Sequence, residues 1–441
     1  MNNIKNNELI SLAIPTTIEH TLQTLVGFID AFLVAKIGLT AVSAVGIANA
    51  ILNVYLALFI ALGVASSSLV AQKLGGRKIE DAKLFATQST VVSIVIGIIF
   101  SLISVCFSKS LLSLMGATDK VLHYAHTFFF LVGGSSIFIS LMTIFSSILR
   151  ATKDTKTPMK ISFIVNILNI LFDYILIFGC GPIPPLGILG TAIGTVLSRI
   201  IGCFLLFKKV QTSICPINLK LFSIDSSLNS LLSLAMPATI ERLVMRIGQV
   251  AYFSLIVSIS SKVFASHSIT GNIEAFTYMP AYGLAAAAST VVAFAVGANN
   301  FEEARYYARL ANQYGVIIMS ILGGILYFGS PIFARLFTQD VEAINQIVTA
   351  LRIDAFAQPA LAISIITTGS LQGMGDTKSP LYSTAIGIWF IRLLGILILS
   401  KWLQLGIAGI WISILIDLYL RSIYLVRKFN KNIIALQKQF P

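Results

Sequence analysis

The chain repeats itself at a constant spacing. Residues 12–19 read LAIPTTIE, and 222 positions later residues 234–241 read LAMPATIE. The same offset relates LRATKDTKTP, which begins at Leu149, to LQGMGDTKSP, which begins at Leu371. It also relates VAQKLGGRKIEDA, from Val70, to VAFAVGANNFEEA, from Val292. Three matches at one offset indicate that the two halves arose by duplication.

The repeated halves are too apolar for a water-soluble protein. Of 441 residues, 56% are hydrophobic and only 11% are charged, and the mean hydropathy is +0.88. A membrane-spanning helix needs roughly 20 apolar residues, and the chain has about twelve such stretches, six in each half. We therefore predict an all-α integral membrane protein with twelve transmembrane helices in two parallel six-helix lobes. The first stretch contains Glu19 and Asp30, so we expect a helix of the mature protein and not a cleaved signal.

The distribution of basic residues predicts the topology. Nineteen Lys and Arg residues fall in the N-terminus, the C-terminus and the loops on their side of the membrane, and six fall in the opposite loops. The positive-inside rule then places both termini in the cytoplasm. The net charge of +13 is explained by this topology, and we expect no nucleic-acid partner. We predict lobes at 1–207 and 229–441, joined by a cytoplasmic linker at 208–228 that contains Asp225-Ser-Ser.

Ionisable side chains inside these apolar stretches mark candidate functional sites. A charged group at the centre of a membrane helix costs at least about 2.5 kcal/mol. Seven acids fall in such positions, and they are Glu19, Asp30, Asp173, Glu241, Glu274, Asp354 and Asp417. The four cysteines have no paired or metal-ligand spacing, so we assign them no site.

Two polar stripes predict a site in the first half. Glu19, Gln23 and Asp30 share one helix face, and Asn169 and Asp173 share another. Both aspartates come a turn or two before the outer end of their helices, so we expect them to meet at one depth. Two carboxylates in a poorly hydrated pocket bind a proton together. They could also hold a cation if the Asn169 amide and nearby hydroxyls complete an oxygen shell. The alternative is that each aspartate caps a helix end near the interface.

The second half differs in its chemistry. Glu241 occupies the position equivalent to Glu19, but Tyr252 stands where the first half has Asp30. We predict that Arg246 forms a buried ion pair with Glu241 or with Glu274, although these groups could instead contact substrate or take part in coupling. Arg199, Arg392 and Asp417 could be further partners, or could extend their side chains towards the membrane interface.

The sequence contains no enzyme motif and no cofactor-binding motif. It lacks the phosphate-cradling G-x-x-x-x-G-K-[ST] that an ATP-driven pump needs. Internally repeated membrane segments are typical of secondary transporters, so we expect transport driven by an ion gradient. The alternatives are a flippase for a lipid or a lipid-linked saccharide, and a membrane receptor or scaffold that transports nothing.

Four segments together resemble the multidrug and toxic compound extrusion (MATE) family. They are FIDAFLVAKIG at residues 28–38, NILNILFD from Asn166, PLGILGTAIGT from Pro185 and GDTKSP from Gly375. The resemblance covers essentially the whole chain. It implies a V-shaped pair of six-helix lobes in the inner (plasma) membrane, which exports cationic or amphiphilic compounds in exchange for H+ or Na+. It also implies a coupling site at Asp30, Asn169 and Asp173 with Thr195 as a companion, and we expect a monomer.

Two positions depart from the sodium-using branch of that family. Where that branch carries acids in its tenth and seventh helices, this chain has Leu361 and Met245. The resemblance is therefore to the DinF-type branch, which implies coupling through the acids of the first lobe. We accordingly favour H+ over Na+.

Overall fold

The computed structural model describes residues 2–222 and 226–439, and helices account for nearly all of them. Eleven of these helices are long and apolar enough to cross a membrane, and the bent pair α4–α5 makes a twelfth span. This confirms the predicted all-helical membrane fold. The first half contains α1 (Asn2–Ile37), α2 (Leu39–Gly75), α3 (Ile79–Leu114), α4 (Asp119–Gly134), α5 (Ser136–Ala151), α6 (Lys156–Phe178) and α7 (Ile188–Gln211). The second half contains α8 (Ser226–Ile259), α9 (Ser261–Thr277), α10 (Met279–Gly297), α11 (Phe301–Phe337), α12 (Val341–Gly373), α13 (Lys378–Ile386) and α15 (Gly406–Gln439). Two π-helical stretches, Gly387–Arg392 and Ile396–Trp402, flank the short α14 (Leu393–Gly395) and extend the α13 span to Trp402.

The helix boundaries repeat the 222-residue offset of the sequence. α2, α3, α4 and α6 begin 222 residues before α9, α11, α12 and α13 respectively. The breaks do not repeat. In the first half the fourth span bends by 45° between α4 and α5. In the second half it is the second span that is interrupted, at Tyr278, where Pro280 in the first turn of α10 cannot donate a backbone hydrogen bond. The breaks therefore fall in different spans of the two halves.

The chain divides into two compact units that do not coincide with the two halves. The N-terminal unit contains Ile18–Leu74 and Lys78–Ala235, and the C-terminal unit contains Met1–Thr17, Gly75–Arg77 and Met236–Pro441. Helices α1 and α8 each begin in one unit and end in the other, and both change units within the repeated LA-x-P-x-T-I-E segment.

The predicted lobes therefore differ from these units at their first helices. The start of α1 belongs to the C-terminal unit because Leu9 and Leu12 are buried in its core, among residues of α10, α11 and α15. The predicted linker is also shorter, since α7 continues through Lys208 and Lys209 to Gln211. Asp225 lies outside the described residues.

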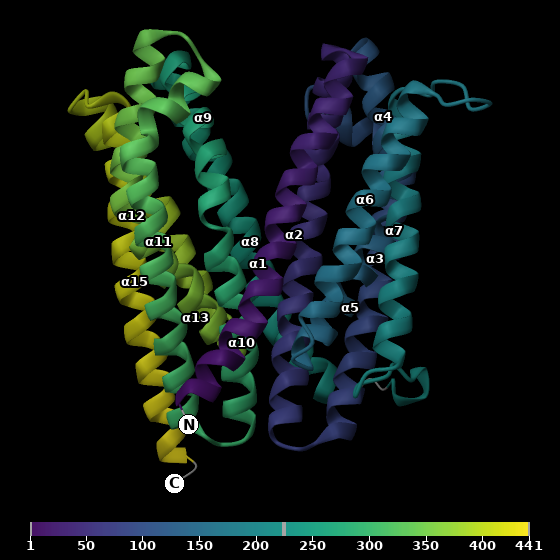
Figure 1. Cartoon of the computed structure of the whole chain (residues 1–441), viewed down its shortest axis with the longest axis vertical. Helices are drawn as coiled ribbons and strands as arrows, with labels where there is room; N and C mark the ends of the chain where they lie inside the picture. The colour runs from purple at the N-terminus through teal and green to yellow at the C-terminus, as the bar shows by residue number, and fades with distance from the viewer. Residues whose placement is uncertain (1, 223–225, 440–441) are drawn as a thin grey trace. The chain divides into compact units, whose positions relative to one another are not determined.

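Charged and polar contacts mark the two ends of the C-terminal unit. At one end Lys5 of α1 pairs with Glu303 of α11 at 2.8 Å, and Gln437 of α15 donates to Glu302 at 2.6 Å. Figure 1 shows the start of α1 and the end of α15 at this same end. At the other end Lys262 pairs with Asp340 at 3.1 Å, and this contact holds the pKa of the Asp340 carboxyl below its usual value. The start of α1 and the end of α15 thus lie at the same end of this unit.

Cysteine labelling tests the predicted orientation of the chain in the membrane. Single cysteines at Lys78 or Lys156, in a cysteine-free background, should react with an impermeant maleimide only after the cytoplasmic face is exposed. Cysteines at Lys120 or Lys262 should react in intact cells, because these loops carry few basic residues. The measurement is mass-tag gel shift before and after membrane permeabilisation. Reversed accessibility of the two sets would contradict the predicted topology.

Candidate functional site

Helix α6 presents a polar stripe to the interior of the N-terminal unit. Asn169 and Asp173 lie one turn apart on α6, and their side chains are buried, with 8% and 0% of their surface exposed. The Asn169 amide donates to Asp173 Oδ1 at 3.3 Å. Burying a carboxylate in an apolar helix costs free energy unless the group is hydrogen-bonded or neutralised. The hydrogen bond from Asn169 satisfies only one of the two carboxylate oxygens of Asp173.

Helix α7 leaves room for the Asp173 carboxyl by presenting a glycine. A Cβ atom added at Gly194 would lie 2.2 Å from Asp173 Oδ1, so any larger residue would displace the carboxyl. Thr195 is the next residue and lies half-buried at this level. Within the described chain, no hydrogen bond joins the Thr195 hydroxyl to Asp173. The companion role predicted for Thr195 rests on this proximity alone.

Asp30 of α1 and Arg199 of α7 complete the charged group around Asp173. Both lie close enough to Asp173 for their charges to interact with it, and Arg199 interacts with both acids. Asp30 Oδ1 and Asp173 Oδ2 are buried without any hydrogen-bond partner in the described structure. The sequence prediction that the two aspartates approach each other agrees with this arrangement. The group therefore contains two carboxylate oxygens without a hydrogen-bond partner in the described structure and one nearby guanidinium.

Glu19 and Gln23, the other members of the predicted α1 stripe, lie in different environments. Glu19 is 4% exposed and accepts from Arg150 of α5 at 3.1 Å, which makes a largely buried ion pair within the N-terminal unit. Gln23 is exposed. The stripe therefore contains one structural ion pair, one exposed amide and the Asp30 carboxyl.

The ion pair predicted for Arg246 is not formed. Arg246 donates to Gln249 at 3.2 Å, and Glu241 accepts from Thr384 of α13 at 3.1 Å. Neither Glu241 nor Glu274 lies within ion-pair distance of Arg246 in the described chain. Glu241 and Arg246 are five residues apart on α8, which turns their side chains to different faces, whereas pairs three or four apart are neighbours.

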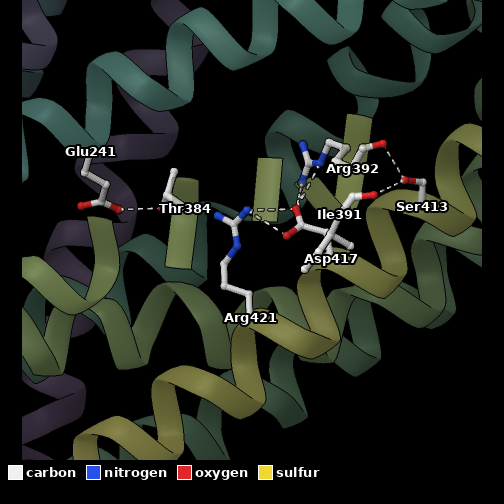
Figure 2. Close-up of polar contacts among 7 residues, drawn as sticks. All are labelled: Glu241, Thr384, Ile391, Arg392, Ser413, Asp417 and Arg421. Carbon is white, nitrogen blue, oxygen red and sulfur yellow. Dashed lines mark hydrogen bonds and ion pairs between the residues drawn. The ribbon is translucent and has the colours of Figure 1, made fainter. Parts of the chain in front are cut away.

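Asp417 of α15 is the centre of the strongest ionic cluster. Arg392 donates to Asp417 Oδ2 through two nitrogens, at 3.1 and 2.8 Å, and Arg421 donates to both oxygens at 3.0 and 2.9 Å. Figure 2 shows the carboxylate between the two guanidinium groups, with Glu241 and Thr384 forming a separate contact. Of the candidates named from the sequence, Arg392 and Asp417 are thus paired with each other, and Arg421 is a second partner that lies one helical turn from Asp417.

A second group of buried polar side chains lies in the C-terminal unit where α9 meets α12. Gln358 donates to Asp354 Oδ2 at 2.7 Å, and Thr277 at the end of α9 donates to Gln358 at 3.4 Å. Asp354 is fully buried, and its Oδ1 atom has no partner in the described structure. Glu274 is close enough to interact with Asp354 through its charge. These residues are hydrogen-bonded mainly to one another.

The fifth and sixth spans of the two halves interlock in opposite ways. In the first half Asp173 on the fifth span fits against Gly194 on the sixth. At the equivalent place in the second half the fifth span has Gly395, and a Cβ added there would lie 2.2 Å from the hydroxyl oxygen of Ser413 on α15. Gly387 makes room for Asp417 in the same manner, at 2.2 Å. In the second half, therefore, the acid between these two spans is Asp417 of the sixth span, and its carboxylate is hydrogen-bonded to two arginines.

A comparison with known protein families decides the identity of this fold. A model of the MatE family matches residues 15–175 and again residues 237–398, so the two matches begin 222 residues apart. The chain belongs to the MatE family. The resemblance that the sequence segments suggested is therefore confirmed at the level of the family, while the assignment to one branch stays a prediction.

Relatives within the MatE family cover nearly the whole chain. The Thermotoga maritima protein described as a probable multidrug resistance protein NorM is 28% identical over 423 residues, which cover 94% of this chain and 90% of the relative. The uncharacterized transporter YisQ of Bacillus subtilis is 27% identical and covers 97% of this chain and 95% of its own length. The first of these relatives is thus described by drug resistance and the second as a transporter.

Solved structures confirm the fold. A MATE protein crystallised in complex with MaL6 superposes with a TM-score of 0.92 at 24% identity, over 98% of this chain and 97% of that chain. A MOP superfamily transporter from Pyrococcus furiosus gives a TM-score of 0.92 at 23% identity, over 98% and 97%, and its description reports a binding pocket of reversed polarity. At these identities the similarity establishes architecture and not substrate.

Three of the polar partners were not predicted from the sequence. Arg150 lies in the last turn of α5, next to the basic loop that follows it, and its sequence position alone does not distinguish it from the cations of that loop. Arg421 and Gln358 each follow an intramembrane acid by four residues. That i,i+4 spacing is the signal that would have identified them as partners of Asp417 and Asp354.

Proposed function

We propose that this MatE-family chain is a cation-coupled exporter of cationic or amphiphilic small molecules, and that the exchanged cation binds at Asp30 and Asp173. The observation that supports this most directly is the pair of buried carboxylate oxygens without partners in the N-terminal unit. A buried unpaired acceptor is rare in native proteins and calls for an explanation such as a ligand or a proton. Alternating access is the mode of transport that this fold supports.

The charges around this pair favour one exchangeable cation. Two carboxylates and the Arg199 guanidinium carry one excess negative charge when both acids are ionised. One proton removes that charge and supplies a donor for an unpaired oxygen. Sodium would need a shell of several oxygens, but the Asn169 group that faces Asp173 is the amide nitrogen. We therefore favour H+ as the coupling ion.

The test is transport by the purified chain in liposomes. A panel of cationic dyes is added to liposomes that contain the protein and a lumenal pH indicator, with and without an imposed sodium gradient. Exchange for H+ should change the lumenal pH when a transported dye is added, and should not require sodium. A protein that moves no dye but equilibrates a labelled lipid between leaflets would instead be a flippase, and the proposal would be wrong.

A further inference from the structure

Two arginines of α8 in the C-terminal unit form no ion pair with any residue that the structure describes. Arg242 and Arg246 are one turn apart, so their guanidinium groups lie on one face of the helix. Arg246 is exposed, and its hydrogen bond goes to the neutral amide of Gln249 at 3.2 Å. Among the described residues, no carboxylate lies within ion-pair distance of either arginine. Their charges are therefore available to a ligand.

The acids nearest to this pair are engaged elsewhere. Glu241 interacts with Arg242 through its charge but accepts its hydrogen bond from Thr384, at 3.1 Å. Glu274 interacts instead with Arg392 and Asp354. Arg392 and Arg421, by contrast, are both hydrogen-bonded to Asp417, as Figure 2 shows. Among the described residues, Arg392 and Arg421 are thus paired with an acid, whereas Arg242 and Arg246 are not.

Arg242 and Arg246 are the 17th and 21st of the 34 residues of α8, so both lie near the middle of this helix. Arg246 interacts through its charge with Tyr278, and both arginines interact with Tyr282. Tyr278 separates α9 from α10, so 17 residues of the span precede it and 19 follow it. A cation at this depth cannot reach an aqueous interface by extending its side chain, and such a group is a candidate for substrate recognition.

Tyr278 and Tyr282, which lie within range of the charges of these arginines, add aromatic surface to the same region. The rings of Tyr278 and Tyr282 are 5.6 Å apart in an edge-on arrangement, and Tyr282 is 41% exposed. Sites for small organic ligands combine aromatic surface with a few well-placed polar groups. A guanidinium presents several donors in one plane and matches the oxygens of a carboxylate or a phosphate.

We infer that Arg242, Arg246, Tyr278 and Tyr282 form a binding site for the anionic group of an aromatic substrate, a carboxylate or a phosphate. This inference rests on the proposed function, since it names the class of substrate that the exporter accepts. The two units would then differ in sign. The N-terminal unit presents acids that hold the coupling cation, and the C-terminal unit presents bases that hold the acidic end of an amphiphilic or zwitterionic substrate.

The inference is tested by equilibrium binding to the purified full chain, without any ion gradient. The probe is fluorescent anthracene-9-carboxylate, and its methyl ester is the neutral control of nearly the same shape. The acid should bind at least about tenfold more tightly than the ester, because a hydrogen bond to a charged group contributes that much or more. Arg242→Gln and Arg246→Gln should each remove roughly that factor for the acid and leave the ester unchanged. Arg246→Lys, which keeps the charge but not the planar donor pair, should bind the acid with intermediate affinity.

The matched control is Arg335→Gln, which removes another exposed arginine of the same unit, in the last turn of α11. It should bind both probes as the unaltered chain does. Equal binding of acid and ester, or full acid binding by both α8 variants, would overturn the inference. So would displacement of the probe by phosphatidylglycerol in nanodiscs, because the arginines would then hold a lipid head group. Because binding is read without a gradient, failure of ion coupling at Asp30 would leave this result intact.

Discussion

Replacing Asp30 with asparagine should reduce ion-driven efflux to the background of protein-free liposomes while leaving a folded protein that still binds substrate. The substitution keeps the size and the hydrogen-bonding capacity of the side chain but removes the group that binds the proton. With Arg199 nearby, the site would then hold one carboxylate and one guanidinium, and no excess negative charge would remain for an exchangeable cation. Dye efflux driven by an imposed pH gradient is the measurement.

Matched variants separate this effect from a general loss of structure. Asp173→Asn should behave as Asp30→Asn does, whereas Asp119→Asn, at an exposed position at the start of α4, should transport normally. Glu241→Gln should retain most activity, because Glu241 is hydrogen-bonded to Thr384 of the C-terminal unit. Full transport by Asp30→Asn together with an inactive Glu241→Gln would show that the coupling site lies in the other unit.

The largest loss of stability is expected from Asp417→Ala. The Asp417 side chain is fully buried and joins Arg392 and Arg421, whose side chains are 14% and 12% exposed. Removing the carboxylate leaves two guanidinium groups facing each other in an apolar unit. Breaking a buried ion pair by removing one partner costs about 3–5 kcal/mol. The apparent melting temperature in detergent, followed by intrinsic fluorescence or size-exclusion chromatography, should fall accordingly.

Replacing all three charged residues of the cluster should lower the stability of the protein less than replacing Asp417 alone. A triple variant with Asp417→Leu, Arg392→Met and Arg421→Met replaces the charges by apolar groups of similar volume, a change that is often neutral in buried clusters. Glu342→Gln, which alters an exposed contact of Lys262, serves as the control and should melt like the unaltered chain. A melting temperature for Asp417→Ala equal to that of the control would show that the two arginines do not depend on Asp417.

The spans could be predicted from the sequence because length and hydropathy determine them almost alone. The duplicated boundaries follow from the 222-residue offset, as the common spacing of α2 and α9 or of α3 and α11 shows. Asp30 and Asp173 could be selected because each belongs to a polar stripe with helical spacing in an otherwise apolar helix. These signals are all contained within one helix.

Contacts between helices could not be predicted in the same way. The rotation of α8 directs Glu241 towards α13 and leaves Arg246 without an acid, which no pattern within α8 reveals. Only the length of α5 shows that Arg150 lies within a helix and not in the basic loop that follows. The fit of Asp173 against Gly194 depends on the register of two helices, and a sequence without an alignment carries no record of that register.

The exchange of helix segments between the two units has a consequence for assembly. A cut between α7 and α8 would yield two polypeptides, and neither would contain a complete unit. The first would carry the start of α1, which packs into the core around Leu9 and Leu12 of the C-terminal unit. The second would carry the start of α8, which belongs to the N-terminal unit. Separately expressed halves should therefore be obligate partners, each stable in the membrane only when the other is made with it, although each holds six spans of its own.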